Sequence, residues 1–93
     1  MQVEVKLFAN FRDKAGDSKT HLEASTAGEL LEKLVRKYDA LEGMVLEEGE
    51  PDPELKNGVS VLLNGRNIRF LDGVSTKFES GDSVAIFPPI GGG

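Results

Sequence analysis

A single amphipathic helix, set between segments with a strand pattern, is the feature that most limits what this 93-residue chain can fold into. Thr26 and Glu29 have the T-x-x-E spacing of a capping box, in which each side chain satisfies a backbone N–H at the helix start. Apolar residues then recur at helical spacing, namely Leu30, Leu31, Leu34, Val35 and Tyr38. The sequence therefore predicts one helix over residues 27–38.

The segments on both sides of this helix alternate apolar and polar residues, which is the pattern of half-buried strands. The dipeptide Asn64-Gly65 is typical of a two-residue hairpin turn. The segments predicted to be strands are residues 2–8, 18–22, 59–63, 66–70 and 83–87. The others are predicted to be a turn over 10–17, short helical turns within 39–49, an acidic loop over 47–57, and an irregular stretch over 71–80 that buries Val74 and Phe78.

This order of elements predicts an α+β fold, because one amphipathic helix can cover one face of a sheet. The first and last strands have the most apolar inward faces, so we expect both in the middle of the sheet. A mixed sheet of four to five strands with one main helix packed across it is a β-grasp. We expect one domain over residues 1–89 and a flexible glycine tail over residues 90–93.

Composition excludes several classes of function. The chain has no cysteine and one histidine, which excludes a disulfide scaffold, a cysteine nucleophile and a cysteine- or histidine-based metal site. Its net charge of −5 repels phosphate backbones, so we expect no nucleic-acid binding. No apolar run approaches the ~18 residues of a membrane span, and the first residues lack the pattern of a signal peptide. We therefore expect a cytoplasmic protein.

The stretch 42–54 holds six acidic residues and no lysine or arginine. The simplest interpretation is a solvated loop that aids solubility. A basic partner or a bound cation is the alternative, although the spacing of a calcium-binding loop is missing.

The carboxyl end of the sequence has two conformationally restricted prolines followed, after one isoleucine, by three conformationally permissive glycines. Pro88-Pro89 ends the last predicted strand and restricts the backbone, whereas the glycines of residues 91–93 have no Cβ and can enter a narrow channel. A carboxylate presented there is a poor electrophile until ATP converts it into an acyl-adenylate. The sequence has no P-loop, so we expect the chain to be the substrate of an adenylating enzyme and not an enzyme itself. The alternative is a non-covalent interaction module with an inert glycine tail.

Residues 81–93, GDSVAIFPPIGGG, resemble the "GDxVAxFPPxxGG" ending of MoaD, the small subunit of molybdopterin synthase, and of the small archaeal modifier proteins. The opening VKLFA at residues 5–9, with Arg12 and Gly16 downstream, and the TAGEL at 26–30 also match, so the resemblance covers nearly the whole chain. It places the chain among the MoaD/ThiS-like, ubiquitin-like proteins. Thiamine-pathway carriers are shorter and usually lack Phe-Pro-Pro, which disfavours a role in thiazole synthesis.

This resemblance implies a chemistry for Gly92 and Gly93. In the family the terminal glycine is adenylated, then converted to a thiocarboxylate that donates sulfur for molybdenum cofactor biosynthesis, or joined to a target lysine by an isopeptide bond. The implied partners are an adenylating enzyme, the large subunit of molybdopterin synthase and target-protein lysines. ATP would be used by the activating partner, and no cofactor or metal would be bound by the chain.

Phe8, Leu62 and Phe87 are apolar residues at outward positions of three predicted strands. They are predicted to form a docking patch on the sheet face away from the helix, because Phe8 and Phe87 are expected on neighbouring strands. Scattered surface side chains are the alternative. The residues predicted to bind partners are Phe8, Leu62, Ile68, Phe87, Pro88, Pro89, Ile90 and Gly91.

The remaining polar residues give weaker signals. His21 lies in a predicted strand without an accompanying acid or nucleophile pattern, so we expect no catalytic role. The lysines are solvated by default, and the sequence does not choose among them as acceptors of a modifier: Lys6, Lys14, Lys19, Lys33, Lys37, Lys56 and Lys77.

Overall fold

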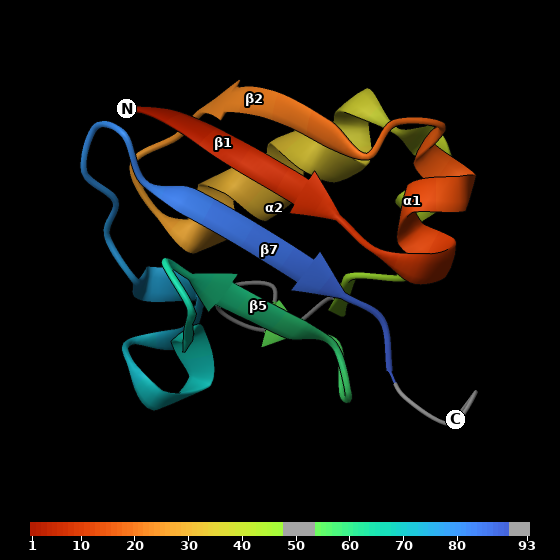
Figure 1. Cartoon of the computed structure of the whole chain (residues 1–93). Helices are drawn as coiled ribbons and strands as arrows, with labels where there is room; N and C mark the ends of the chain where they lie inside the picture. The colour runs from red at the N-terminus through yellow and green to blue at the C-terminus, as the bar shows by residue number, and fades with distance from the viewer. Residues whose placement is uncertain (48–53, 90–93) are drawn as a thin grey trace.

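The computed structural model describes residues 1–47 and 54–89, and its centre is a five-stranded sheet in the order β2-β1-β7-β5-β6 (Figure 1). The strands of this sheet are β1 (Gln2–Leu7), β2 (Lys19–Glu23), β5 (Ser60–Leu63), β6 (Arg66–Asn67) and β7 (Ser83–Phe87). A separate antiparallel pair consists of β3 (Leu46–Glu47) and β4 (Glu54–Leu55). The helices are α1 (Ala9–Ala15) and α2 (Ala27–Lys37), with 3₁₀ turns η1 (Asp39–Leu41), η2 (Ile68–Phe70) and η3 (Gly73–Ser75).

The first and last strands lie next to each other in the interior of the sheet. β1 and β7 run parallel, with Val5 opposite Val84 and Leu7 opposite Ile86. All four side chains are buried, because the inward faces of both strands contact the core under α2. Both outer neighbours, β2 and β5, pair antiparallel with them, so the sheet is mixed. The predicted β-grasp with both terminal strands inside the sheet is confirmed.

The helix α2 begins as its sequence predicts. The Thr26 hydroxyl accepts a hydrogen bond from the Glu29 N–H at 3.3 Å. The Glu29 carboxylate accepts one from the Ser25 N–H at 2.8 Å, so the reciprocal bond reaches one residue further back than in a standard capping box. The helix lies across one face of the sheet (Figure 1), and Leu30, Leu31 and Leu34 are fully buried. The buried apolar core consists of Val3, Val5, Leu7, Phe11, Ala24, Ala27, Leu30, Leu31, Leu34, Tyr38, Leu41, Val45, Val59, Val61, Ile68, Phe78, Val84 and Ile86.

Residues 10–17 were expected to be a turn, and that prediction is wrong. They lie mostly in the short helix α1, which ends at Gly16 in the left-handed conformation, with φ at +82°. Phe11 is the one fully buried side chain of this helix. A seven-residue helix with one core position shows no repeating apolar spacing, which is why the sequence pattern did not reveal it.

The predicted strand over 66–70 is also mostly wrong. The hairpin turn is confirmed, with Asn64 and Gly65 both at positive φ, but β6 ends at Asn67. There the Asn67 side chain accepts a hydrogen bond from the Arg69 N–H, and residues 68–70 form the 3₁₀ turn η2. A side chain that bonds its own backbone two residues on competes with the strand ladder.

The segments 39–47 and 54–57 contain one 3₁₀ turn, as expected, and the short β3–β4 pair, which was not expected. The middle of the predicted acidic loop, residues 48–53, lies outside the described residues. In the stretch 71–80, Phe78 is buried as predicted and Val74 is half-buried. No helix in residues 1–47 and 54–89 is long and apolar enough to cross a membrane.

Candidate functional site

The sheet has an open face on the side opposite α2, and its apolar end lies where β7 finishes. Phe8 follows β1 directly, and its N–H donates to the Ile86 carbonyl at 3.3 Å, which extends the β1–β7 pairing by one residue. That register brings the Phe8 ring beside Phe87. The rings stack with centroids 4.4 Å apart and planes 11° from parallel.

Leu62 and the two prolines complete this apolar end. On β5, Leu62 lies opposite Ala85 and Ser60 lies opposite Phe87, so β5 and β7 place these four side chains on one face of the sheet. A groove of about 400 Å³ lies between them, lined by Ala9, Ser60, Leu62, Phe87, Pro88 and Pro89. We call Phe8, Leu62, Phe87, Pro88 and Pro89 the docking patch.

The patch places an apolar surface immediately before the carboxyl end of the sequence. Phe87 is the last residue of β7, and Pro88 and Pro89 lead directly toward residues 90–93. Proline fixes its own φ and restricts the residue before it, so the exit from the sheet is stiff. The stacked rings therefore lie next to the point where the chain leaves the sheet.

Ile68 does not belong to this surface, and its predicted place there is wrong. It is fully buried, because the turn η2 rotates it into the core instead of leaving it on an outward strand position. Ile90, Gly91, Gly92 and Gly93 lie outside the described residues. Ala9 and Ser60 line the groove and were missed, although Ser60 shares the outward phase of Leu62 on β5.

Charged side chains occupy the other end of the same face. Glu4 lies opposite His21 of β2, and Lys6 lies opposite Lys19. The Glu4 carboxylate has the Lys6 and Lys19 ammonium nitrogens 3.7 Å away and the His21 Nε2 3.9 Å away. The lysines are exposed and Glu4 is half-buried, so each lysine pair contributes about 0–1 kcal/mol to stability. They make the face hydrophilic beyond the docking patch.

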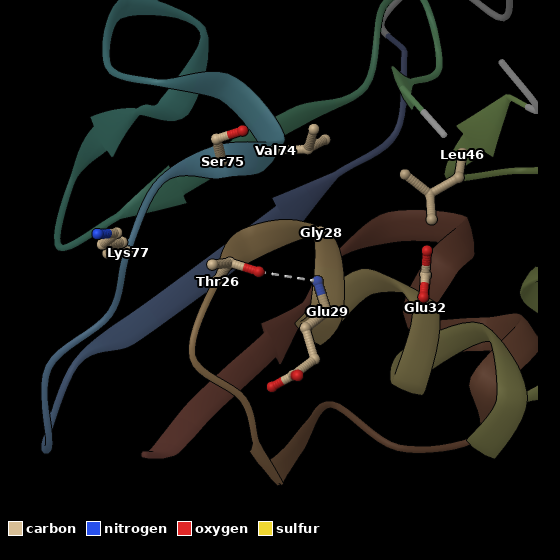
Figure 2. A pocket seen from close by; sticks show the side chains of 8 residues that line it. All are labelled: Thr26, Gly28, Glu29, Glu32, Leu46, Val74, Ser75 and Lys77. Atoms are coloured by element: carbon tan, nitrogen blue, oxygen red, sulfur yellow. Dashed lines mark hydrogen bonds between the residues drawn. The ribbon is translucent and has the colours of Figure 1, made fainter. Parts of the chain in front are cut away.

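A second hollow, of about 440 Å³, lies beside the first turn of α2 (Figure 2). The hydrogen bond from the Glu29 N–H to the Thr26 hydroxyl lies at this pocket, and Val74 and Lys77 face it from the segment around η3. Its lining mixes two carboxylates with one ammonium and shares no residue with the groove of the docking patch. Within residues 1–47 and 54–89, no three His, Asp or Glu side chains gather into a set that could hold a metal ion.

Comparison with known proteins identifies relatives that match the chain from end to end. Residues 5–93 match the model of the ThiS family. Small archaeal modifier protein 3 of Haloferax volcanii is 38% identical, over all of this chain and all of the relative. The sulfur carrier protein CysO of Mycobacterium tuberculosis is 28% identical, again over the whole of both chains. The solution structure of small archaeal modifier protein 1 from Methanosarcina acetivorans superposes with a TM-score of 0.90 at 37% identity, covering 99% of this chain and 96% of that one.

Proposed function

The chain belongs to the ThiS family, and from that we propose that it is a ubiquitin-like carrier whose carboxyl end, at Gly93, is activated by a partner enzyme. The activated end would then deliver sulfur or become joined to a lysine of a target protein. The observation that carries this proposal is the end-to-end match to both a protein modifier and a sulfur carrier. The chain is the substrate in this reaction, and the adenylating enzyme is the catalyst.

The activation step follows from the chemistry of a carboxylate. A Gly93 carboxylate oxygen attacks the α-phosphorus of ATP, a bond to that phosphorus forms, and pyrophosphate leaves. The resulting acyl-adenylate has a good leaving group on the carbonyl carbon. Because the reaction consumes ATP, we place it in the cytoplasm.

The same intermediate serves both outcomes. A sulfide sulfur that replaces AMP leaves a thiocarboxylate directly. A persulfide sulfur that replaces AMP leaves an acyl disulfide, and a second thiol then attacks the donor sulfur, forms a disulfide with it and releases the thiocarboxylate. The thiocarboxylate can donate its sulfur to a molybdopterin precursor on a synthase subunit. A lysine ε-amine that replaces AMP forms an isopeptide bond and releases a proton. The similarity to small archaeal modifier protein 3 supports conjugation to lysine, and the similarity to the sulfur carrier protein CysO supports sulfur delivery.

The docking patch offers a partner a rigid apolar surface next to residues 90–93. A partner that bound residues 90–93 alone would lose much of the binding energy to the cost of ordering the chain, so we expect it to hold a rigid surface as well. Phe8 and Phe87 form such a surface one residue before the prolines. Aromatic anchors of this kind carry a disproportionate share of binding energy.

Intact-mass spectrometry tests the proposal. The chain is incubated with the adenylating enzyme of its own organism, ATP and a sulfur donor, and the expected product is heavier by the exchange of one oxygen for one sulfur. Purification of a tagged chain from its own cells under denaturing conditions tests conjugation, and peptides carrying a Gly93–lysine linkage are expected. An unchanged mass with a competent enzyme, together with no linked peptides, would favour the inert interaction module instead.

A further inference from the structure

Pro89 rests directly on the backbone of Gly58. Gly58 has a φ of +86°, and a Cβ built on it would lie 3.0 Å from the Pro89 Cβ and 3.1 Å from its Cγ. Contacts this short are tighter than most Cβ contacts in proteins, so Pro89 would have to move by a few tenths of an ångström to accept the Cβ. The absence of a side chain at residue 58 is therefore what allows Pro89 to lie where it does.

The turn that carries Gly58 is held in place from two directions. The Arg69 guanidinium donates to the Val59 carbonyl and, at 3.0 Å, to the Lys56 carbonyl. The Lys56 N–H donates to the Val45 carbonyl at 2.8 Å, and its ammonium donates to the Gly43 carbonyl at 2.5 Å. Arginine presents its donors in a rigid planar fork, so two carbonyls on one guanidinium fix the turn more firmly than two separate bonds.

We propose that Gly58 is a positioning residue that sets the direction in which the chain leaves the domain after Pro89. The clamped turn acts as a fixed support, and Pro89 is the last described residue that touches it. This inference rests on the proposed function, because the direction matters only if Gly93 must reach a partner's active site.

The two contacts of the domain then have separate tasks. The docking patch determines how strongly the domain binds its partner, and the Gly58–Pro89 contact determines where the carboxylate arrives. A reacting carboxylate must come within roughly 3–3.5 Å of the phosphorus in line with the leaving group. A sideways shift at Pro89 moves the point from which the remaining residues reach that site.

The test compares Gly58→Ala with Gly81→Ala. Gly81 has a φ of +87°, so both alanines meet the same backbone strain, but a Cβ at residue 81 has nothing within 4 Å. Chain-dependent ATP–pyrophosphate exchange is measured with the adenylating enzyme. For Gly58→Ala we expect kcat to fall about tenfold with KM within about twofold of the parent, because the new Cβ displaces Pro89 by a few tenths of an ångström and a full 1 Å misplacement can cost roughly 100-fold. For Gly81→Ala we expect both constants to match the parent.

Rescue distinguishes positioning from loss of folding. Pro89→Gly removes the Cβ and Cγ that the new methyl would meet, so Gly58→Ala should cost nothing further in that background. Thermal unfolding is recorded for every variant, and the two alanine variants should lose similar amounts of stability. Equal kinetics for Gly58→Ala and Gly81→Ala, or a Gly58→Ala effect that persists in the Pro89→Gly background, would overturn the inference. No exchange with the parent chain would instead count against the proposed function.

Discussion

Phe8 and Phe87 stack on the open face of the sheet, and their arrangement shows how two residues far apart in sequence come to form one surface. The sequence predicted both on the outward side of adjacent strands, and the structure confirms that they stack, with ring centroids 4.4 Å apart. Their role in docking remains a prediction. A docking role can be distinguished experimentally from a purely structural one, because both rings are half-buried and lie outside the core under α2.

Phe87→Ala is expected to weaken binding to the activating enzyme by about 1–3 kcal/mol, the range of a moderate interface anchor. Stability should fall by less than the ~3–5 kcal/mol that a core phenylalanine costs. Phe8→Ala should behave alike, and the double variant should be non-additive because the rings touch. Calorimetric titration and chemical denaturation measure the two effects.

Phe70→Ala is the matched control for both variants. Phe70 is 87% exposed on η2 and takes no part in the stack, so its removal should leave binding and stability unchanged. If Phe70→Ala weakens binding as much as Phe87→Ala does, the enzyme binds a different surface from the docking patch.

Tyr38 gives a prediction about pH. Burial is the largest cause and raises the pKa of the Tyr38 hydroxyl above its ordinary value, while the Thr20 side chain lowers it in part. The nearby Asp17 carboxylate, which accepts the hydrogen bond of the hydroxyl at 2.7 Å, raises the pKa further. The native state therefore holds this proton more tightly than the unfolded chain does. The associated stability is fully present below the unfolded pKa near 10 and is lost as pH rises through the native pKa.

The chain has one tyrosine, so ultraviolet absorbance during an alkaline titration follows Tyr38 alone. Its midpoint should lie above that of a free tyrosine. Asp17→Asn should lower the midpoint but leave it raised, since burial is the larger cause. A midpoint in the parent chain at or below the free value would show that the hydroxyl is solvated.

Among the elements, those with a repeating pattern were predictable and those set by single contacts were not. The helix α2 follows from its cap and apolar spacing, and β1 and β7 follow from alternation. The helix α1 depends on burying Phe11 alone, and β6 stops because the Asn67 side chain bonds the Arg69 N–H. A single buried side chain or a single side-chain hydrogen bond to the backbone produces no repeating apolar pattern in the sequence.

The Phe11 contact makes α1 testable as an element. Phe11→Ala should destabilise the domain by about 3–5 kcal/mol, because the side chain is 1% exposed and leaves a cavity. Asn10→Ala, on the exposed neighbour in the same helix, should change stability by less than about 0.5 kcal/mol. Urea denaturation measures both. If the two variants are equally stable, α1 contributes little to the core.

At the scale of the whole molecule, the residues that form the core and the residues proposed to react lie in different parts of the sequence. The buried apolar core consists of side chains between Val3 and Ile86, and the residues proposed to react lie beyond the last strand. The sequence predicted the docking patch because register follows from alternation, but it misplaced Ile68, whose burial depends on a 3₁₀ turn. The division into a domain over 1–89 and a tail over 90–93 remains a prediction.

That division predicts that the tail is dispensable for folding. Removing residues 90–93 should leave the free energy of unfolding within about 0.5 kcal/mol of the parent value, since residues beyond the last element of a domain contribute little to its stability. Removing residues 86–93 is the comparison, because it deletes Ile86 from the core and should unfold the domain. A large loss of stability from the shorter deletion would show that the tail packs against the domain.

The central claim is that Gly93 carries the carboxylate that ATP activates, and ATP–pyrophosphate exchange tests it most directly. The adenylating enzyme is assayed with the parent chain and with a chain lacking Gly93, after denaturation curves have shown that both are equally folded. We predict exchange that depends on the parent chain and is lost when Gly93 is removed. Exchange that continues at the parent rate without Gly93, or that does not depend on the chain at all, would contradict the claim.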